Sequence, residues 1–405
     1  MKTFIAITSE LDDLEFASQE LTAQINEKMQ SAGIGPLKNT IGIVYCDADV
    51  DVEALGGLLH SKLGFDVAGL TTTATIERYN GYNDMGILLC VLTADDVDFS
   101  VGSAVGLSID NYAQAIGDAY ATARAHSNEA PQLILTLAPY IADLTSEHYM
   151  EILDSISGGA PIFGGIATDH YDLLYQKTFI NGDAYADGLV FILISGNIKP
   201  VFAIEHHFST KAEKKGIITQ SSENLVQMVG DLTFRDYVES IVPVPDDELI
   251  VYNFQSTPFI MELPDYEKNE QPVVRALCTI DHDTGAGGFL SKMPTGSAIY
   301  MSIIQRCNLE ESCEGAMTKI IAEMAKNDGY NYSLVLISTC NARHLLMGDT
   351  KSLESNILGK RLEDAPPELN AIGFYGFGEI CPTGARPDGT MKNRFHNISF
   401  ALCAI

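Results

Sequence analysis

The chain has 405 residues and is 46% hydrophobic, a composition that supports a large buried core and two or three domains. Asp and Glu number 54 against 25 Lys and Arg, which gives a formal net charge of −29. Such a negative surface repels phosphate backbones and anionic lipid head groups, so the composition excludes nucleic-acid binding and membrane-surface binding as expected functions.

The N-terminal segment lacks the hydrophobic region of a signal peptide, because residues 1–7 run apolar for only a few positions before Glu10, Asp12 and Asp13. The apolar stretch 189–194 is far shorter than the roughly 20 residues that a membrane helix needs. None of the eight cysteines belongs to a C-x-x-C pair, so reduced thiols are expected. Together these features predict a cytoplasmic protein.

In chain order, the first predicted element is a helix over residues 14–29, whose apolar residues recur every three or four positions and which Gly33 closes. It makes residues 1–34 a predicted helical extension that packs on the first lobe. The strands that follow are continuous apolar runs, which is typical of strands covered on both faces. Helices alternate with these strands, and this alternation favours an α/β fold.

One plan recurs three times in the chain: a strand, a helix, a strand that ends in a glycine-containing turn, and a closing strand. The segments of the first copy are 40–46, 52–63, 67–73 and 86–92. The second copy has 133–137, a helix after Thr145, 161–169 and 188–194, and the third has 334–338, 351–359, 372–380 and 397–402. The region 249–304, with a strand at 249–252, is a candidate for a fourth, degenerate copy.

This repetition predicts a two-lobed, pseudo-symmetric α/β protein of strand–helix–strand–strand units, with mostly buried sheets flanked by helices. The expected lobes are residues 35–215 and 216–405. Glycine in the repeated turns permits positive φ and the close approach of another group. Ligands of α/β sheets bind outside the strand ends. We therefore expect the turns to converge on a concave small-molecule pocket between the lobes.

Sequence motifs of catalysis and nucleotide binding are missing. There is no Walker loop, no G-x-S-x-G and no H-E-x-x-H. Carboxylates adjoin imidazoles at Asp169–His170 and Asp281–His282, but neighbours on a strand point to opposite faces, which argues against joint metal ligation. We expect no catalytic residue and no metal site. An enzyme acting on a small metabolite, with these four residues as acid–base groups, is an alternative.

Arg343 follows directly on a buried strand, and its guanidinium group matches a carboxylate bidentately. It either clamps a ligand carboxylate or forms a structural ion pair with one of the many acids, and the sequence leaves both open. Glu379 is a candidate partner for a ligand amino group. A pocket that contained both residues would suit an amino acid.

Cys381 introduces a different ligand chemistry, because a thiolate ahead of a proline in an exposed loop can ligate haem iron. Burial as a small hydrophobe is the other interpretation of this cysteine. The leading interpretation of the chain needs no cofactor. Haem is the alternative cofactor, with Cys381, His170 and His282 as candidate ligands.

Several segments together resemble the FIST family, with its N-terminal and C-terminal parts, over about residues 35 to 405. These segments are 69–72, 160–169, 179–182, 373–380 and 395–397, together with Cys340-x-x-Arg343. In this resemblance Cys381 stands where a small residue is expected before Pro382, which favours the haem alternative.

The resemblance implies a sensory module of bacterial and archaeal signal transduction that binds a small ligand, with an amino acid as the usual proposal, and that is not an enzyme. Another branch that it resembles binds haem and reports nitric oxide to a histidine kinase, so a haem-based gas sensor is the second hypothesis. Since the two parts account for the chain, we expect the signal to pass to a separate partner, such as a histidine kinase. The predicted ligand contacts are Thr71, Thr72, Gly164, Gly165, Thr168, Asp169, Arg343, Gly376, Gly378 and Glu379.

Overall fold

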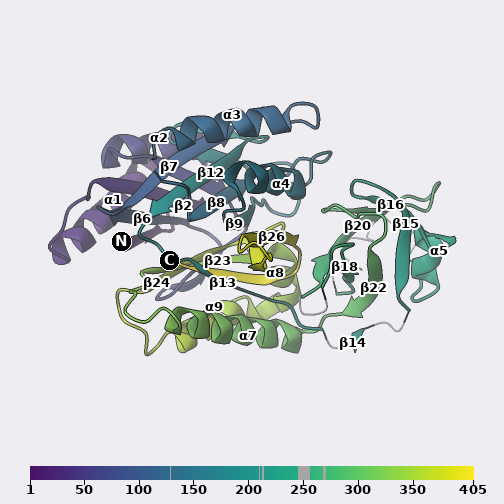
Figure 1. The fold of residues 1–405 in the computed structure, drawn as a ribbon. Coiled ribbons are helices and arrows are strands. Elements are labelled where there is room, and N and C mark those ends of the chain that lie inside the picture. Colours follow the sequence, from purple (N-terminus) through teal and green to yellow (C-terminus); the bar gives the residue numbers. More distant parts are fainter. Residues whose placement is uncertain (128, 209, 212–213, 245–255, 268–270) are drawn as a thin grey trace.

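Three six-stranded sheets with helices on their outer sides form one body, and a smaller, mostly β domain lies beside it (Figure 1). The structure, a computed structural model, describes residues 1–127, 129–208, 210–211, 214–244, 256–267 and 271–405.

The body consists of three units with the same order of elements: strand, helix, strand, helix, strand, hairpin and closing strand. Unit 1 comprises β1 (Lys2–Thr8), α1 (Leu14–Ser31), β2 (Asn39–Cys46), α2 (Val52–Leu63), β3 (Val67–Thr71), the hairpin of β4 (Thr75–Glu77) and β5 (Gly81–Asn83), and β6 (Ile87–Ala94). Unit 2 comprises β7 (Val97–Ala104), α3 (Tyr112–Arg124), β8 (Leu133–Ala138), α4 (Ser146–Ser157), β9 (Ile162–Ile166), the hairpin of β10 (Thr178–Ile180) and β11 (Asp183–Tyr185), and β12 (Leu189–Gly196).

Unit 3 follows the same order but carries two helices, joined by a short 3-10 turn, in place of its second helix. It comprises β13 (Val201–Glu205), α7 (Arg306–Ala325), β23 (Leu334–Cys340), α8 (Asn341–Met347), α9 (Leu353–Arg361), β24 (Asn370–Gly376), the hairpin of β25 (Glu379–Ala385) and β26 (Met391–His396), and β27 (Phe400–Ala404). Unit 3 is also interrupted between β13 and α7 by the smaller domain, which we call the inserted domain.

The inserted domain is built from antiparallel strand pairs and one short helix. Its elements are β14 (Thr210–Lys211), β15 (Gly216–Ser222), β16 (Leu225–Val229), β17 (Leu232–Thr233), α5 (Phe234–Glu239), β18 (Phe259–Glu262), β19 (Val273–Arg275), β20 (Leu277–Ile280), β21 (Gly287–Phe289) and β22 (Ala298–Ile303). In the described residues between 256 and 280, where a fourth copy would need its helix, the chain forms β18, β19 and β20, so the fourth copy predicted in this region is wrong. The strand predicted at 249–252 lies outside the described residues.

The three predicted repeats are confirmed by the strand pairing. In each unit the middle strands run parallel, as β2·β3, β8·β9 and β23·β24, and the closing strand runs antiparallel beside them. The helix between two parallel strands is the usual crossover of an α/β sheet. The mixed α/β class with buried sheets and flanking helices is therefore the observed one.

The hairpins are exchanged between the units in a cycle. The β4–β5 hairpin of unit 1 pairs with β24 of unit 3, with Thr75 opposite Phe374. The β10–β11 hairpin of unit 2 pairs with β3 of unit 1, and the β25–β26 hairpin of unit 3 pairs with β9 of unit 2. Each sheet of the body thus contains strands from two units.

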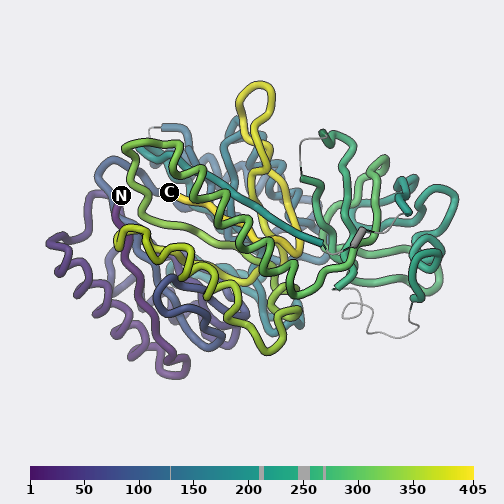
Figure 2. Tube along the Cα trace, turned by 90° about the horizontal axis from the view of Figure 1, so that it is seen from below, coloured from purple at the N-terminus to yellow at the C-terminus, as the bar shows by residue number. Residues whose placement is uncertain are grey.

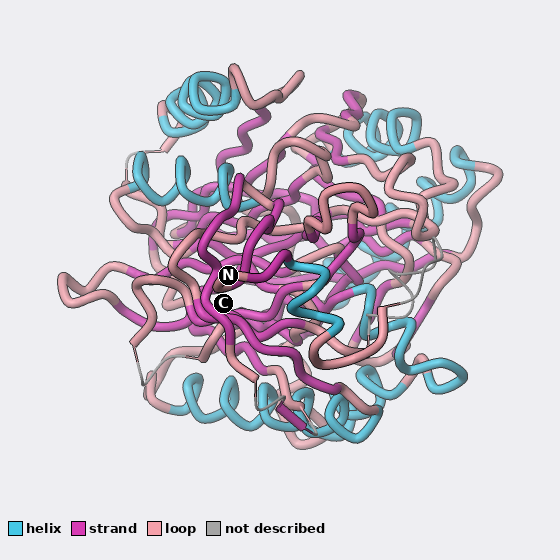
Figure 3. The backbone as a smooth tube through the Cα atoms, turned by 90° about the vertical axis from the view of Figure 1, so that its right-hand side faces the viewer, coloured by secondary structure: helices cyan, strands magenta, loops and turns pink. Residues whose placement is uncertain are grey.

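The inner faces of the three sheets share one core, and their outer faces carry the helices. Figure 3 shows strands in the middle of the molecule and helices around the outside. The shared core contains Tyr45 and Leu70 from one sheet, Leu135 from the second, and Leu336 and Phe374 from the third. Both faces of these strands are covered, which explains their continuous apolar sequences.

The ends of the helices follow local sequence signals. Asp51 begins α2 by accepting a hydrogen bond from Ala54 N at 3.2 Å, and Gly64 ends it with a φ of 76°. The predicted extension, residues 1–34, contains a strand as well as the helix: β1 pairs with β6 and belongs to the first sheet. The chain ends lie near each other, away from the inserted domain (Figure 2).

Candidate functional site

The three units cross at the centre of the body, where the segment after each middle strand leaves its own sheet for another. Thr168 N donates to Thr71 O at 2.9 Å, and Phe377 N donates to Ile166 O at 3.2 Å. The hydroxyl of Thr168 also donates to Tyr375 O at 2.8 Å. We call this place the crossing centre; it comprises residues 71–74, 166–169 and 375–379. The turns chosen from the sequence therefore meet in space.

The crossing centre is closely packed. Thr71, Thr72, Thr168, Asp169 and Glu379 have no exposed surface. Four prominent cavities bounded by described residues have linings that include none of the ten predicted contacts. The pocket expected at this point is not one of them, and ligand contact by these ten residues stays a prediction.

The predicted glycines allow close packing at this centre. A Cβ atom added to Gly164 would lie 2.0 Å from Thr136 O, and one added to Gly378 would lie 2.1 Å from a ring carbon of Phe395. Gly164 also has a φ of 147°. At these two glycines the close approach that glycine permits is made by other groups of the same chain and not by a ligand.

Arg343 forms the structural ion pair that the sequence left open as one of two alternatives. Its Nε donates to Glu354 Oε1 at 2.7 Å, and both side chains are fully buried. The two remaining nitrogens donate to Ser312 Oγ at 2.8 Å and to Leu309 O at 3.1 Å. The whole fork of the guanidinium group is therefore occupied by protein groups.

Glu379 lies among hydroxyl and thiol groups. Its Oε2 accepts from Ser399 Oγ at 2.6 Å and from Ser399 N at 3.1 Å. Burial disfavours the charged carboxylate and raises the pKa of Glu379 to about 8. The group is therefore mostly a neutral acid at pH 7, and Ser399 takes the place of the amino group expected from the sequence.

Glu379 is expected to make the stability of the protein pH-dependent. Because its folded pKa of about 8 exceeds the ordinary value of 4.5, the folded state holds a proton that the unfolded state releases between those values. The stability from this proton is complete below about pH 4.5 and is lost as the pH rises through about 8. We expect Glu379→Gln to be more stable than the wild type, in urea unfolding, at about pH 8.5 and to lose that advantage at about pH 4.5.

The matched control is Glu310→Gln, on the exposed side of α7, which should stay within about 0.5 kcal/mol of the wild type. If Glu379→Gln differs from the wild type in unfolding free energy by the same amount at both pH values, the raised pKa of Glu379 is contradicted.

Asp169, another predicted ligand contact, uses its buried carboxylate to hold a loop. It accepts backbone hydrogen bonds from Leu173 N at 3.1 Å, Leu174 N at 2.8 Å and Tyr175 N at 2.9 Å. A carboxylate bound to three backbone donors stabilises the turn that supplies them. Asp169 thereby fixes the course of the chain after β9.

The loop that Asp169 holds is conformationally strained. Tyr171 has a φ of 77° and Leu173 a φ of 59°, values that residues other than glycine adopt only when their surroundings impose them. This loop places His170 and Tyr171 at the junction of the units.

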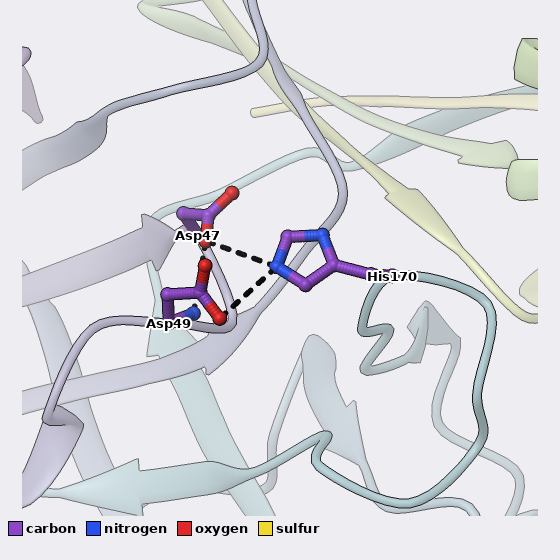
Figure 4. Close-up of side chains that lie close together, drawn as sticks. All are labelled: Asp47, Asp49 and His170. Atoms are coloured by element: carbon purple, nitrogen blue, oxygen red, sulfur yellow. Dashed lines mark hydrogen bonds and ion pairs between the residues drawn. The ribbon is translucent and has the colours of Figure 1, made fainter.

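His170 lies beside two carboxylates from the turn after β2 (Figure 4). Its Nε2 is 3.5 Å from Asp47 Oδ1 and 3.2 Å from Asp49 Oδ1. Asp47 is buried, and burial is the main cause that raises its pKa. The donor atoms lie within 4.8 Å of one another, and two carboxylates with one imidazole form a set that Zn²⁺ or Mn²⁺ accepts. These three residues are the ones that can hold a metal ion in the described part of the chain.

His344 of α8 is held between two tyrosines near this loop. Its Nδ1 is 2.6 Å from the Tyr171 hydroxyl, and its Nε2 is 2.7 Å from the Tyr82 hydroxyl. Burial lowers the pKa of His344 to about 4, so the neutral ring donates with one nitrogen and accepts with the other. Tyr82, Tyr171 and His344 come from units 1, 2 and 3, and their hydrogen bonds join all three.

The candidate haem ligands do not form a haem site. Cys381 is fully buried in the shared core, with its Sγ 3.6 Å from Pro382 O, so its interpretation as a buried small hydrophobe is confirmed and the exposed loop of the haem alternative is wrong. Burial raises the pKa of this thiol, which disfavours the thiolate that iron would bind. His170 lies beside Asp47 and Asp49, whereas His282 lies 2.9 Å from Arg235 in the inserted domain. The residues present do not fit the cofactor.

The acid–base groups of the enzyme alternative lie in two different places. Asp281 and His282 belong to the turn between β20 and β21, where the Asp281 carboxylate accepts from Thr284 N at 2.7 Å. Asp169 and His170 belong to the loop after β9 in the body, and Asp169 holds that loop. The convergence required for joint catalysis is not seen for these four residues.

A cavity of about 330 Å³ opens between the body and the inserted domain, and we call it the interdomain cavity. Its size is at the lower end of the range for small-molecule sites. It is lined by α4 and the β25–β26 hairpin of the body and, in the inserted domain, by Leu263, Pro264, Asp265, Arg275, Lys292 and Pro294. The charged residues of this lining are Glu147, Glu151, Asp154, Asp265, Arg275, Lys292, Arg386 and Arg394.

A buried ion pair crosses from the inserted domain to the body at this cavity. Arg275 Nη2 is 3.1 Å from Glu147 Oε1, and both side chains are more than nine-tenths buried. Burial lowers the pKa of Arg275 to about 10 and raises that of Glu147. Arg275 Nε and Glu147 Oε2 have no hydrogen-bond partner among the described residues.

Neither Arg275 nor Glu147 is among the site residues predicted from the sequence. Glu147 stands in the first turn of α4, where an acidic residue is ordinary because it favours the helix dipole. Arg275 ends a short apolar strand in the inserted domain. No local signal connects the two residues, which are far apart in the chain.

The described residues contain no helix that combines the length and apolar character required to cross a membrane.

Comparison with protein families gives two matches. Residues 40–230 match the FIST N domain, and residues 234–382 match the FIST C domain. The first match covers β2 to β13 of the body and the start of the inserted domain, and the second reaches β25. No curated protein matches the chain.

Proposed function

The chain belongs to the FIST family, whose domains are sensors in signal transduction, and we propose that it binds an amino acid or a similar metabolite in the cytoplasm. Binding, and not catalysis, is the activity that the family supports. The bound state would be reported to a separate signalling protein, such as a histidine kinase.

The observation that carries this proposal is the interdomain cavity. Its charged lining residues are four acids and four bases, and its volume of about 330 Å³ suits a molecule of amino-acid size. A site with both signs of charge favours a zwitterion over a simple anion or cation, because each ligand charge meets an opposite one. Met150, Leu263 and Phe395 add apolar surface for a side chain.

The position of the cavity supports a role in signalling. Its walls belong to the body and to the inserted domain, which are joined here by the Arg275–Glu147 pair. A ligand that binds between the body and the inserted domain favours the relative position of the two for which its affinity is higher. A partner protein that contacts both the body and the inserted domain would respond to that position.

The test is a binding screen of the full chain with each of the twenty common amino acids. Each is added at a concentration about 100 times a dissociation constant in the micromolar range. A ligand that binds only the folded state at that concentration stabilises it by about 2.7 kcal/mol, which raises the melting temperature by several degrees. Isothermal titration would confirm each positive result. If no amino acid shifts the melting temperature or releases heat, the amino-acid proposal is overturned.

A further inference from the structure

Two half-satisfied charges, Arg275 and Glu147, belong to the lining of the interdomain cavity. Resting on the function proposed above, we propose that Arg275 and Glu147 bind the ligand directly: the Arg275 guanidinium takes its carboxylate and the Glu147 carboxylate takes its ammonium group. In the ligand-free structure the two residues bind each other through one nitrogen and one oxygen. The ligand replaces this contact with two.

The orientation of Arg275 is fixed by the protein, as a receptor for a carboxylate requires. Its Nη1 donates to Phe395 O at 2.8 Å and to Val274 O at 3.2 Å. The other edge of the guanidinium, Nε with Nη2, is the fork that matches a carboxylate bidentately. On this edge Nη2 is engaged by Glu147, and Nε has no partner among the described residues.

Glu147 is also held from one side only. Its Oε1 accepts from Arg275 Nη2 at 3.1 Å and from Lys292 N at 3.2 Å. Its Oε2 is buried and has no hydrogen-bond partner among the described residues. A buried carboxylate oxygen left in this state is unfavourable, and an ammonium donor would remove the penalty.

The other bases of the lining already have acidic partners. Arg386 lies 2.8 Å from Asp154, Arg394 lies 2.6 Å from Asp265, and Lys292 lies 2.7 Å from Glu151. These pairs are partly exposed, whereas Arg275 and Glu147 are both buried. The unfilled hydrogen-bonding capacity in the cavity is therefore concentrated at one Arg and one Glu.

This arrangement selects a chemical class of ligand. A carboxylate alone would satisfy Arg275 and leave Glu147 a buried charge without its partner, and an amine alone would do the reverse. A molecule that carries both groups on one carbon atom satisfies both residues. The expected ligands are α-amino acids, and neither their deaminated nor their decarboxylated analogues.

The experiment uses the full chain and the amino acid that binds it best in the screen. Its affinity is measured by isothermal titration and compared with the affinities of the carboxylic acid that lacks its ammonium group and the amine that lacks its carboxylate. We expect both analogues to bind at least about 100-fold more weakly, since each leaves a buried charge unpaired. An analogue that binds as tightly as the amino acid overturns the proposal.

The matching variant is the double substitution Arg275→Gln/Glu147→Gln, which removes both charges together and so leaves no unpaired buried ion. We expect it to keep a cooperative thermal transition and to bind the amino acid at least about 100-fold more weakly. Lys62→Gln, which breaks a partly exposed ion pair with Glu15 outside this lining, is the control and should change affinity less than about threefold. If the double variant unfolds, Arg275→Lys, which keeps the charge but loses the fork, replaces it with the same expectation of weakened binding.

The outcomes separate the two proposals. If the wild type binds an amino acid and the variants bind it equally well, the role of Arg275 and Glu147 is overturned while the proposed function stands. If the wild type binds no amino acid in the screen, the proposed function fails, and this inference fails with it.

Discussion

Replacing Arg343 with methionine is expected to lower the free energy of unfolding by about 3–5 kcal/mol. Arg343 and Glu354 are both fully buried, and the substitution leaves the Glu354 carboxylate without its cation. Thr339 Oγ1, which donates to Glu354 at 3.1 Å, cannot replace a full positive charge. Urea unfolding followed by circular dichroism measures the loss.

Two further variants make this result specific to the ion pair. Arg343→Met/Glu354→Met removes both charges, and we expect it to recover most of the loss because apolar residues of similar size often replace a buried pair at little cost. Lys326→Ala breaks an exposed pair with Glu323 and should cost less than about 1 kcal/mol. A loss in Arg343→Met that is no larger than in Lys326→Ala would contradict the structural role.

Separating the chain into residues 1–206 and 305–405 is expected to leave neither part folded alone. The first part would lack the β25–β26 hairpin that completes the sheet of unit 2. The second would lack the β4–β5 hairpin that pairs with β24. Each part would also expose its side of the core that the three sheets share, and a domain that folds alone needs its own core.

We expect each separate part to show no cooperative thermal transition, and the two parts expressed together to form one complex with such a transition. Calorimetry and size-exclusion chromatography measure both results. A cooperative transition in either part by itself would show that the exchanged hairpins are not required for folding.

The predicted lobes, residues 35–215 and 216–405, meet at a boundary inside the inserted domain, between β14 and β15. The body itself is organised by three units that exchange hairpins. The prediction gave two lobes and not three interlocked units, because the periodicity of a sequence shows only which faces of a strand are buried. A hairpin that pairs with another unit buries the same faces as one that stays in its own sheet.

The sequence by itself determined the buried strands of the three copies and their repetition. The runs 40–46, 133–137 and 334–338 are apolar because both faces of β2, β8 and β23 are covered, and this burial is visible in local composition. The sequence also showed that glycine-containing turns recur at equivalent strand ends, and these turns do meet in space.

Only the tertiary structure decided what the polar residues do. The sequence around a buried arginine does not show whether its partner is a ligand or a glutamate on the next helix. In the folded protein Arg343 is paired with Glu354. The contacts of His170 with Asp47 and of Arg275 with Glu147 join residues from different units or domains, so no local pattern specifies them. Charge pairing over such separations depends on the three-dimensional positions of the side chains, because electrostatic interaction depends on distance in space and on burial.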